Sequence, residues 1–175
     1  DPGRAPPPEA TSGAANFVGC GCVYRRSIFL RTSGYVPLPV AYGMEEADLS
    51  IRLHAMRCKI IHDPSLRVVH DLEPAGRETD AVVAAAMVSN VALLAWLRYP
   101  VILWPLGIAQ VLRKAVEIVI KGESAGVIRG LLGIPRHLRE HRHQREALEA
   151  RAVISHVRMR RRTMRSASSS TAAEN

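Results

Sequence analysis

The 175-residue chain is poor in aromatic residues and in cysteine. Aromatic side chains make up 5% of the sequence, too few for the stacking platforms that bind single-stranded nucleic acid, and we expect no specific nucleic-acid partner. The three cysteines match no zinc-ligand spacing, and we expect reduced thiols. These cysteines are Cys20, Cys22 and Cys58. No charged-then-apolar export segment opens the sequence, which favours a cytoplasmic protein. Because residue 1 is Asp rather than Met, we expect a fragment or a processed product.

The chain also lacks a long unbroken apolar run. A membrane-spanning helix needs roughly 20 consecutive apolar residues. The apolar stretch 82–120 is interrupted by Arg98, Pro100 and Pro105. Two alternatives remain: the helices lie in a membrane interface, or they cover the body of the protein. The first would place three aromatic side chains near the lipid headgroups: Trp96, Tyr99 and Trp104.

The net charge of +8 is distributed unevenly. Much of the excess lies after Pro135, whereas the first half of the chain is closer to neutral. A basic C-terminal arm on a near-neutral body predicts an anionic surface nearby, either phospholipid or nucleic acid.

Composition divides the chain into four parts. Residues 1–16 read as a linker or loop, and 17–79 as one folded part. Residues 80–165 read as a helical extension, with helices expected at 82–97 and 106–121, a short one ending before Pro135, and a basic one from 136 to about 165. Residues 166–175 are of low complexity and predict disorder.

The part from 17 to 79 contains strand-like segments. Residues 16–26 form a short apolar candidate interrupted by Gly19 and Gly21, and a glycine in a strand often marks a close approach to the backbone. Residues 59–63 and 66–70 are further strand candidates. Residues 27–32 predict a helical turn.

The segment 43–53 places three acids and an arginine within about three helical turns. Glu45, Glu46 and Asp48 lie near the start of the expected helix, where the positive end of its dipole favours them. Asp48 and Arg52 are spaced for an i,i+4 ion pair. One interpretation is a capped amphipathic surface helix.

A second interpretation comes from the order of motifs around this helix. The motifs are Gly19-x-Gly21, Arg25-Arg26, Gly34-Tyr35, Glu45-Glu46-x-Asp48-Leu49-x-x-Arg52, and Pro64 followed by Val68-Val69-His70. This order, over about residues 16–71, resembles the acceptor-side half of a family 2 glycosyltransferase. The downstream sequence is similar to bacterial members that build surface polysaccharides.

The resemblance implies an α/β fold: part of a GT-A-type mixed sheet, followed by the α-helical C-terminal extension. It implies an inverting enzyme that moves a sugar from a nucleotide-sugar donor to a hydroxyl group of a saccharide or lipid-linked acceptor. The expected location is the inner face of the plasma membrane, with the protein peripheral to it.

The resemblance also implies roles for individual residues. Glu46 corresponds to the family's catalytic base, although the family carries Asp at that position. Asp48 is the second catalytic candidate, paired with Arg52 to hold the start of the helix. Glu45, Gly21 and Arg25 would lie on the acceptor side or steer phosphate.

The metal is expected mainly outside these residues. In the family, a divalent ion (Mn²⁺ or Mg²⁺) on the leaving diphosphate is bound by an Asp-x-Asp segment in the nucleotide-binding half. No Asp-x-Asp occurs here, so the donor site is missing and we expect the isolated chain to be inactive. His70 resembles a histidine that helps to hold this ion. The alternative is an ordinary structural histidine.

Two other functions are alternatives to sugar transfer. A non-catalytic basic module that binds anionic lipid or nucleic acid would explain the arginine-rich C-terminus but not the acidic helix. Hydrolysis by paired acids needs two carboxylates facing each other across the sugar. Glu45 and Glu46 are adjacent and point about 100° apart, so they do not fit it.

Overall fold

The structure is a computed structural model that describes residues 12–42, 44–63, 65, 67–69 and 79–173. This part of the chain is mostly helical. In chain order its elements are β1 (Ser12–Ala14), η1 (Gly19–Gly21), α1 (Arg26–Phe29), α2 (Met44–Ala55), β2 (Ile60–His62), α3 (Asp80–Arg98), η2 (Val101–Leu103), α4 (Trp104–Ile120), α5 (Ser124–Glu140), η3 (Arg142–Gln144) and α6 (Ala150–Ala173).

The predicted mixed α/β sheet is wrong. Within the described ranges, the β-structure is one antiparallel pair, β1 with β2, in which Ser12 lies opposite His62. The segment containing Gly19 and Gly21 forms a 3-10 turn instead of a strand, and residues 67–69 lie in no strand. A strand is stable only when a neighbour pairs with its backbone groups. Residues 17–69 offer too few such neighbours to build a GT-A-type sheet.

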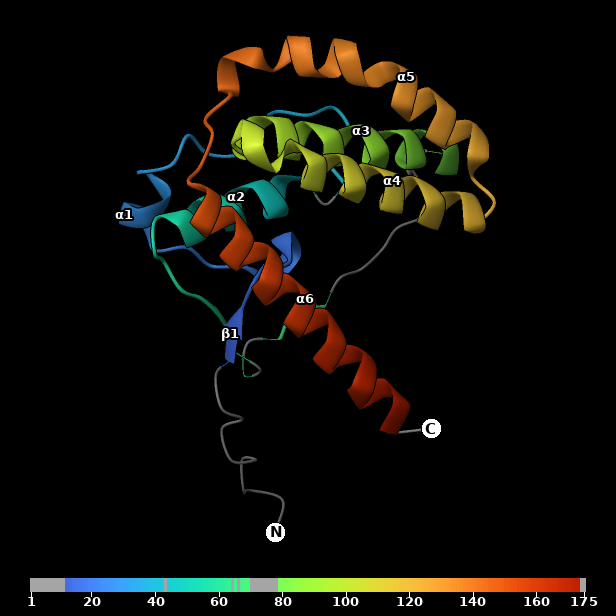
Figure 1. The fold of residues 1–175 in the computed structure, drawn as a ribbon. Helices are drawn as coiled ribbons and strands as arrows, with labels where there is room; N and C mark the ends of the chain where they lie inside the picture. The colour runs from blue at the N-terminus through green and yellow to red at the C-terminus, as the bar shows by residue number, and fades with distance from the viewer. Residues whose placement is uncertain (1–11, 43, 64, 66, 70–78, 174–175) are drawn as a thin grey trace.

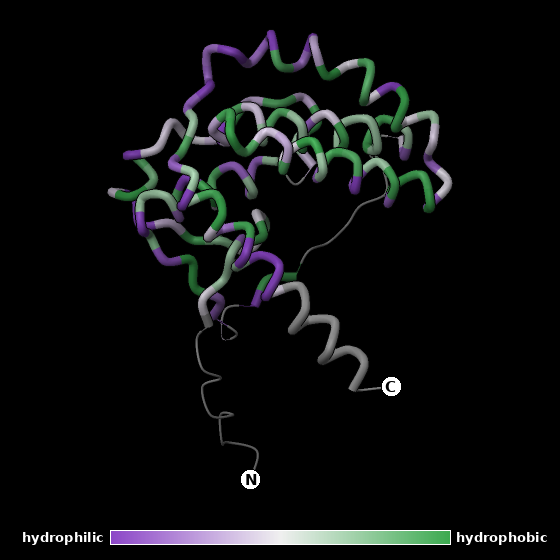
Figure 2. The backbone as a smooth tube through the Cα atoms, viewed as in Figure 1, coloured by the Kyte–Doolittle hydropathy of each residue, from purple (hydrophilic) through white to green (hydrophobic). Residues whose placement is uncertain are grey.

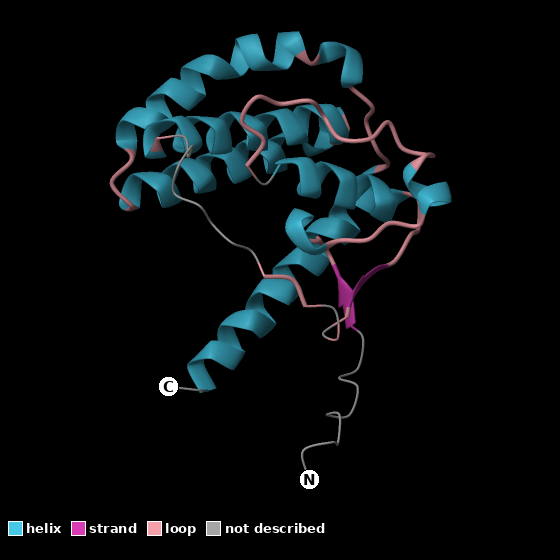
Figure 3. Ribbon diagram, turned by 180° about the vertical axis from the view of Figure 1, so that it is seen from behind, coloured by secondary structure: helices cyan, strands magenta, loops and turns pink. Residues whose placement is uncertain are grey.

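Other helices pack around α3. Both α4 and α5 pack along α3, and α2 packs against it as well. Figure 1 shows α5 arching over α3 and α4, while α6 crosses beside α2 and points away from the body. Seen from behind, the small strand pair lies beside α6, away from α3, α4 and α5 (Figure 3). The helices therefore supply most of the folded body.

Two apolar cores stabilise this body. The first joins α2, α3 and α6 through side chains that include Met44, Ile51, Leu97 and Val153. The second joins α3, α4 and α5 through side chains that are almost fully buried: Val88, Val111, Ile118 and Val127. Burial of each such side chain stabilises the fold by about 1.5–3 kcal/mol relative to exposure.

Glycines allow α3 to approach its two neighbours closely. A Cβ at Gly130 of α5 would lie 2.6 Å from the carbonyl oxygen of Ala85, and one at Gly126 would lie 2.6 Å from the Cβ of Ala84. On α4, a Cβ at Gly107 would lie 2.6 Å from the Cβ of Ala95. These distances are below van der Waals contact, so any larger residue would push the helices apart.

The helix boundaries in the second half differ from prediction. We expected a helix to end before Pro135, but α5 continues through Pro135 to Glu140. The break comes at residues 141–149, where the amides of Glu146 and Leu148 donate to the carbonyls of Leu97 and Arg98. The chain leaves the helical path there because it pairs with the end of α3. Helix α6 then extends to residue 173, although we expected disorder from residue 166.

One described helix, α3, is long and apolar enough to cross a membrane by length and composition alone. It lies at the centre of the bundle, where Val88, Leu93 and Leu97 are completely buried. It also buries two polar side chains, Asn90 and Arg98, and both are hydrogen-bonded to other segments of the chain. These contacts are those of a core helix.

Candidate active site

Helix α2 places the acidic residues as its sequence predicts. It spans Met44–Ala55, with Glu45 and Glu46 in its first turn. Residues 47–53 are buried on all sides of the helix, among them Leu49, Ile51 and Leu53, so the helix is enclosed by the body and is no free surface element. The positions of the polar side chains on α2 are therefore defined by packing.

Asp48 is completely buried and is saturated by arginines. Its Oδ2 lies 2.7 Å from Nη2 of Arg52, which is the i,i+4 ion pair that the spacing predicts. Its Oδ1 lies 2.5 Å from Nε of Arg98 on α3, and Nη2 of Arg98 donates to Oδ2 at 3.3 Å. Both carboxylate oxygens thus accept charge-assisted hydrogen bonds, so Asp48 has no oxygen directed to a substrate.

The two arginines link Asp48 to distant segments. Arg98 also donates to the carbonyl of Gln144 and lies 3.6 Å from Glu146. Arg52 donates to the hydroxyl of Ser33 at 3.1 Å and to the carbonyl of Gly34. Burial lowers the pKa of Arg52, an effect that the charge of Asp48 opposes. We call Asp48, Arg52 and Arg98 the buried ion cluster.

Glu46 lies in a different setting from Asp48. Its Oε1 accepts a hydrogen bond from the amide of Gly19 at 3.3 Å. Its Oε2 is buried and has no hydrogen-bond partner among the described residues. A Cβ at Gly19 would lie 2.8 Å from Oε1, so any side chain there would displace the carboxylate. Gly19 is therefore the residue that lets the backbone approach Glu46.

Three side chains next to the Gly19 turn were not among the predicted site residues: Cys22, Tyr24 and Tyr35. The thiol of Cys22 lies 3.0 Å from the hydroxyl of Tyr24, and that hydroxyl is hydrogen-bonded to the hydroxyl of Tyr35. Burial raises the pKa of Tyr24, and hydrogen bonds to Cys22 and Tyr35 add to the effect. Burial also raises the pKa of Tyr35, with a smaller contribution from the charge of Glu46.

Together, Glu46, Gly19, Cys22, Tyr24 and Tyr35 form a compact group that we call the Glu46 cluster. Of these, Tyr35 belongs to the Gly34-Tyr35 motif, so that turn was the available sequence signal. The cluster combines one unpaired carboxylate oxygen, which is buried, with tyrosine hydroxyls that can donate or accept hydrogen bonds.

The other predicted site residues lie as follows. Glu45 is half-buried, and its Oε2 has no hydrogen-bond partner among the described side chains. Gly21 is exposed, and a Cβ there would be in ordinary contact with Val68 at 3.5 Å. Arg25 is exposed at the start of α1. His70 falls outside the described residues.

The described residues do not fit the divalent ion that the resemblance implied. In the ranges searched, one group of side chains is close enough to hold a metal, with ligand atoms within 4.8 Å of one another. It consists of His137 and Glu140 at the end of α5 and His141, which follows the helix. Glu140 is already paired with Arg136 at 2.9 Å. The group lies in an arginine-rich segment, whose positive charge disfavours a cation.

The two best-defined pockets do not include the Glu46 cluster. One, of about 630 Å³, lies between the strand pair, the end of α2 and Met159 of α6. The other, of about 340 Å³, lies between α3 and α5 beside Asn90 and His137. Neither of these two pockets is the cleft that we expected next to Glu46 for the sugar acceptor.

Comparisons with known proteins do not assign this chain to a family. No protein-family model matches it, and neither the curated proteins nor the solved structures contain a significant match. The resemblance of residues 16–71 to a glycosyltransferase thus rests on the motifs alone.

Proposed function

We propose that this chain is the acceptor-side part of an inverting glycosyltransferase, with Glu46 as the catalytic base. The donor-binding half and the metal ligands would be supplied by another polypeptide segment. The acceptor would be a saccharide or lipid-linked hydroxyl at the cytoplasmic face of a membrane. The observation that carries the proposal is the carboxylate of Glu46, which has one oxygen held and the other unpaired.

The chemistry requires such a carboxylate. A hydroxyl group is a weak nucleophile, so a base must accept its proton as the oxygen attacks the anomeric carbon. The bond from that carbon to the phosphate of the donor breaks in the same step, and the nucleotide leaves with the bonding electron pair. The amide of Gly19 orients the carboxylate through Oε1. Oε2 is buried and unpaired, so binding of the acceptor would have to open access to this oxygen before it takes the proton. The hydroxyl of Tyr35, whose raised pKa keeps it protonated, can donate a hydrogen bond to the acceptor.

The hydrogen bonds of Asp48 exclude it as the catalytic base. A base needs a lone pair that faces the substrate, and both oxygens of Asp48 are bonded to Arg52 and Arg98 in the protein interior. We propose that Asp48 is a positioning residue, which anchors α2 and thereby the backbone of Glu46.

A non-catalytic membrane-binding module is the second candidate. It is favoured by the charge distribution: residues 1–100 contain ten basic and ten acidic residues, whereas residues 101–175 contain fourteen basic and six acidic ones, a net charge of +8. This candidate assigns no role to the unpaired carboxylate of Glu46.

Substitution of the base tests the proposal. In a preparation that contains the donor-binding half, Glu46→Gln should lower sugar transfer by about 10²–10⁴-fold, because the amide cannot accept the proton. Transfer is measured with a radiolabelled nucleotide-sugar and membrane-extracted acceptor lipids. The matched control is Glu140→Gln, at an exposed glutamate on α5, which should retain transfer. Equal activities of the two variants would refute the assignment of the base.

A further inference from the structure

Helix α4 has two apolar faces, and one of them is exposed. The face toward α3 buries Gly107, Val111, Ala115 and Ile118. At 100° per residue, a second arc follows directly beside it. Its large apolar side chains are between 47% and 79% exposed: Ile108, Leu112, Val116, Val119 and Ile120. The polar residues of the helix are confined to the remaining arc: Gln110, Arg113, Lys114 and Glu117.

The exposed apolar side chains continue on both sides of α4. Val101 and Ile102 of η2 are 63% and 79% exposed. On α5, which contacts α4 and follows it after Gly122, Ile128, Leu131 and Leu132 are 60%, 39% and 77% exposed. Figure 2 shows hydrophobic residues along α4 and the adjacent end of α5, and hydrophilic ones at the far end of α5. We call these ten exposed residues the apolar face.

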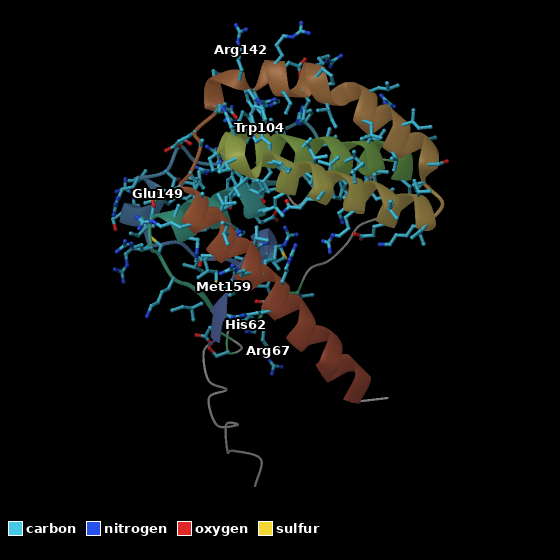
Figure 4. All side chains as sticks on the ribbon, in the orientation of Figure 1. His62, Arg67, Trp104, Arg142, Glu149 and Met159 are labelled. Carbon is cyan, nitrogen blue, oxygen red and sulfur yellow. The ribbon has the colours of Figure 1, made fainter. Side chains whose placement is uncertain are left out.

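The surroundings of the apolar face carry positive charge. Residues 101–145 contain eight arginines and lysines and three glutamates, a net charge of +5. Two of the glutamates are neutralised locally. Glu117 is paired with Lys114 at 3.0 Å and with Lys121 at 3.5 Å, and Glu140 is paired with Arg136. Arg142 points outward from the end of α5 (Figure 4). A partner must therefore be both apolar and anionic.

The shape of the face favours a lipid surface over a protein groove. Its residues are exposed on η2, α4 and α5, and none of the ten lines either of the two pockets described above. The arc on α4 is aliphatic over about four turns, the pattern of a helix lying in a membrane interface. Trp104, at the start of α4, is 39% exposed, and Arg145 lies 5.6 Å from the centre of its ring. Tryptophan and arginine are suited to the headgroup level.

This surface differs from the one the sequence predicts. Of the aromatic residues expected at the headgroups, Tyr99 is buried and donates to Gln110, and Trp96 is half-buried against the core. Trp104 is the exposed member of the three. The basic C-terminal arm carries none of the ten residues of the apolar face. We propose that α4 and the first half of α5 dock parallel to an anionic bilayer, with the apolar face inserted among the lipids.

Vesicle flotation of the full chain tests this docking. We expect binding to phosphatidylcholine vesicles that contain phosphatidylglycerol, and binding that weakens with added salt because the basic residues contribute. The test variant is Leu112→Glu/Val116→Glu, in which two charges replace inserted side chains. It should bind such vesicles at least about ten-fold more weakly.

The matched control changes the net charge by the same amount elsewhere. Val23 and Val69 are 88% and 94% exposed and lie outside the apolar face, so Val23→Glu/Val69→Glu should retain most of the binding. Thermal unfolding of both variants should match that of the unchanged chain. In a Trp96→Phe background, the emission of Trp104 should shift to the blue on vesicle addition.

Several outcomes would overturn the proposal. One is an equal loss of binding in both double variants, since binding would then follow net charge alone. Another is a large loss of stability in Leu112→Glu/Val116→Glu but not in the control, since the face would then be packed within the protein. A third is that the chain without substitutions does not bind the vesicles and instead forms an oligomer, and that the Leu112→Glu/Val116→Glu variant is a monomer. None of these readouts uses sugar transfer, so the docking can fail or stand independently of the proposed enzyme.

Discussion

Two regions of this molecule are stabilised in different ways. Residues 79–163 are helices packed through apolar side chains and close glycine contacts. Residues 12–69 contain one longer helix, α2, and otherwise short elements and loops. In this region many backbone carbonyls lie outside regular structure, and buried polar side chains donate to them.

These donors come from across the molecule. The amide of Asn90 donates to the carbonyls of Val40 and Ala41, and His156 lies 3.1 Å from the carbonyl of Ala15. A buried carbonyl must find a donor, and helices supply their own. The comparison teaches that the irregular region depends on a few polar contacts with the helical one, whereas the helical region depends on apolar area. Three predictions test this difference between the two regions.

The largest loss of folding stability is expected for Arg98→Met. It leaves Asp48 buried with one arginine fewer, and breaking a buried ion pair costs about 3–5 kcal/mol in the free energy of unfolding. Urea denaturation measures the loss. The control is Arg136→Met, whose partner Glu140 is exposed, and which should cost less than about 1 kcal/mol. Similar costs for the two variants would contradict the importance of the buried ion cluster.

A smaller loss of folding stability is expected when the pH is lowered. Burial lowers the pKa of His156 to about 4, opposed by its hydrogen bond to Ala15 and reinforced by His54 and Arg160. The unfolded chain, with a histidine pKa of about 6.5, binds this proton more tightly. The protein should therefore keep its full stability above pH 6.5 and lose about 2–3 kcal/mol as the pH falls toward 4.

Denaturant unfolding at a series of pH values checks this prediction. His156→Gln should remove the step between pH 6.5 and 4, because glutamine does not titrate. His143→Gln, at an exposed histidine on η3, should leave it in place. A step of equal size in all three proteins would assign the pH dependence to other groups.

The smallest effects are expected within α5. Gly130→Ala should destabilise the protein by about 1–3 kcal/mol, because the new methyl group would meet the backbone of Ala85. At Gly133 of the same helix no atom lies within 4 Å of the added Cβ, so Gly133→Ala should stabilise by about 0.5–1 kcal/mol. Thermal unfolding measures both. Stabilisation by both substitutions would show that α5 is not held close to α3.

The helices were largely predictable because their signals are local. Apolar periodicity and flanking Gly, Pro and charged residues predicted helices at 82–97 and 106–121, within two residues of α3 and α4. The acidic helix and its Asp48–Arg52 pair were found in the same way. Pro135 was misleading because the packing of α5 on α3 compensates for one missing hydrogen bond.

The contacts that organise the candidate site were not predictable. Arg98 lies fifty residues from Asp48 in the sequence, and it appeared only as an interruption of an apolar run. The interaction of Gly19 with Glu46 is equally non-local, as is strand pairing, which explains why the predicted sheet was wrong. Spacing within a helix is visible in a sequence, but the register between distant segments depends on the fold.

The uneven distribution of charge along the chain affects how the molecule approaches a charged surface. The first hundred residues are electrically balanced and the remainder is positive, so the protein has a permanent dipole moment. Near a negatively charged sheet of lipid, within the screening distance of about 10 Å at 0.1 M salt, this moment exerts a torque. The molecule would turn before contact, so that its positive part approaches the lipid first and its neutral part faces away from it.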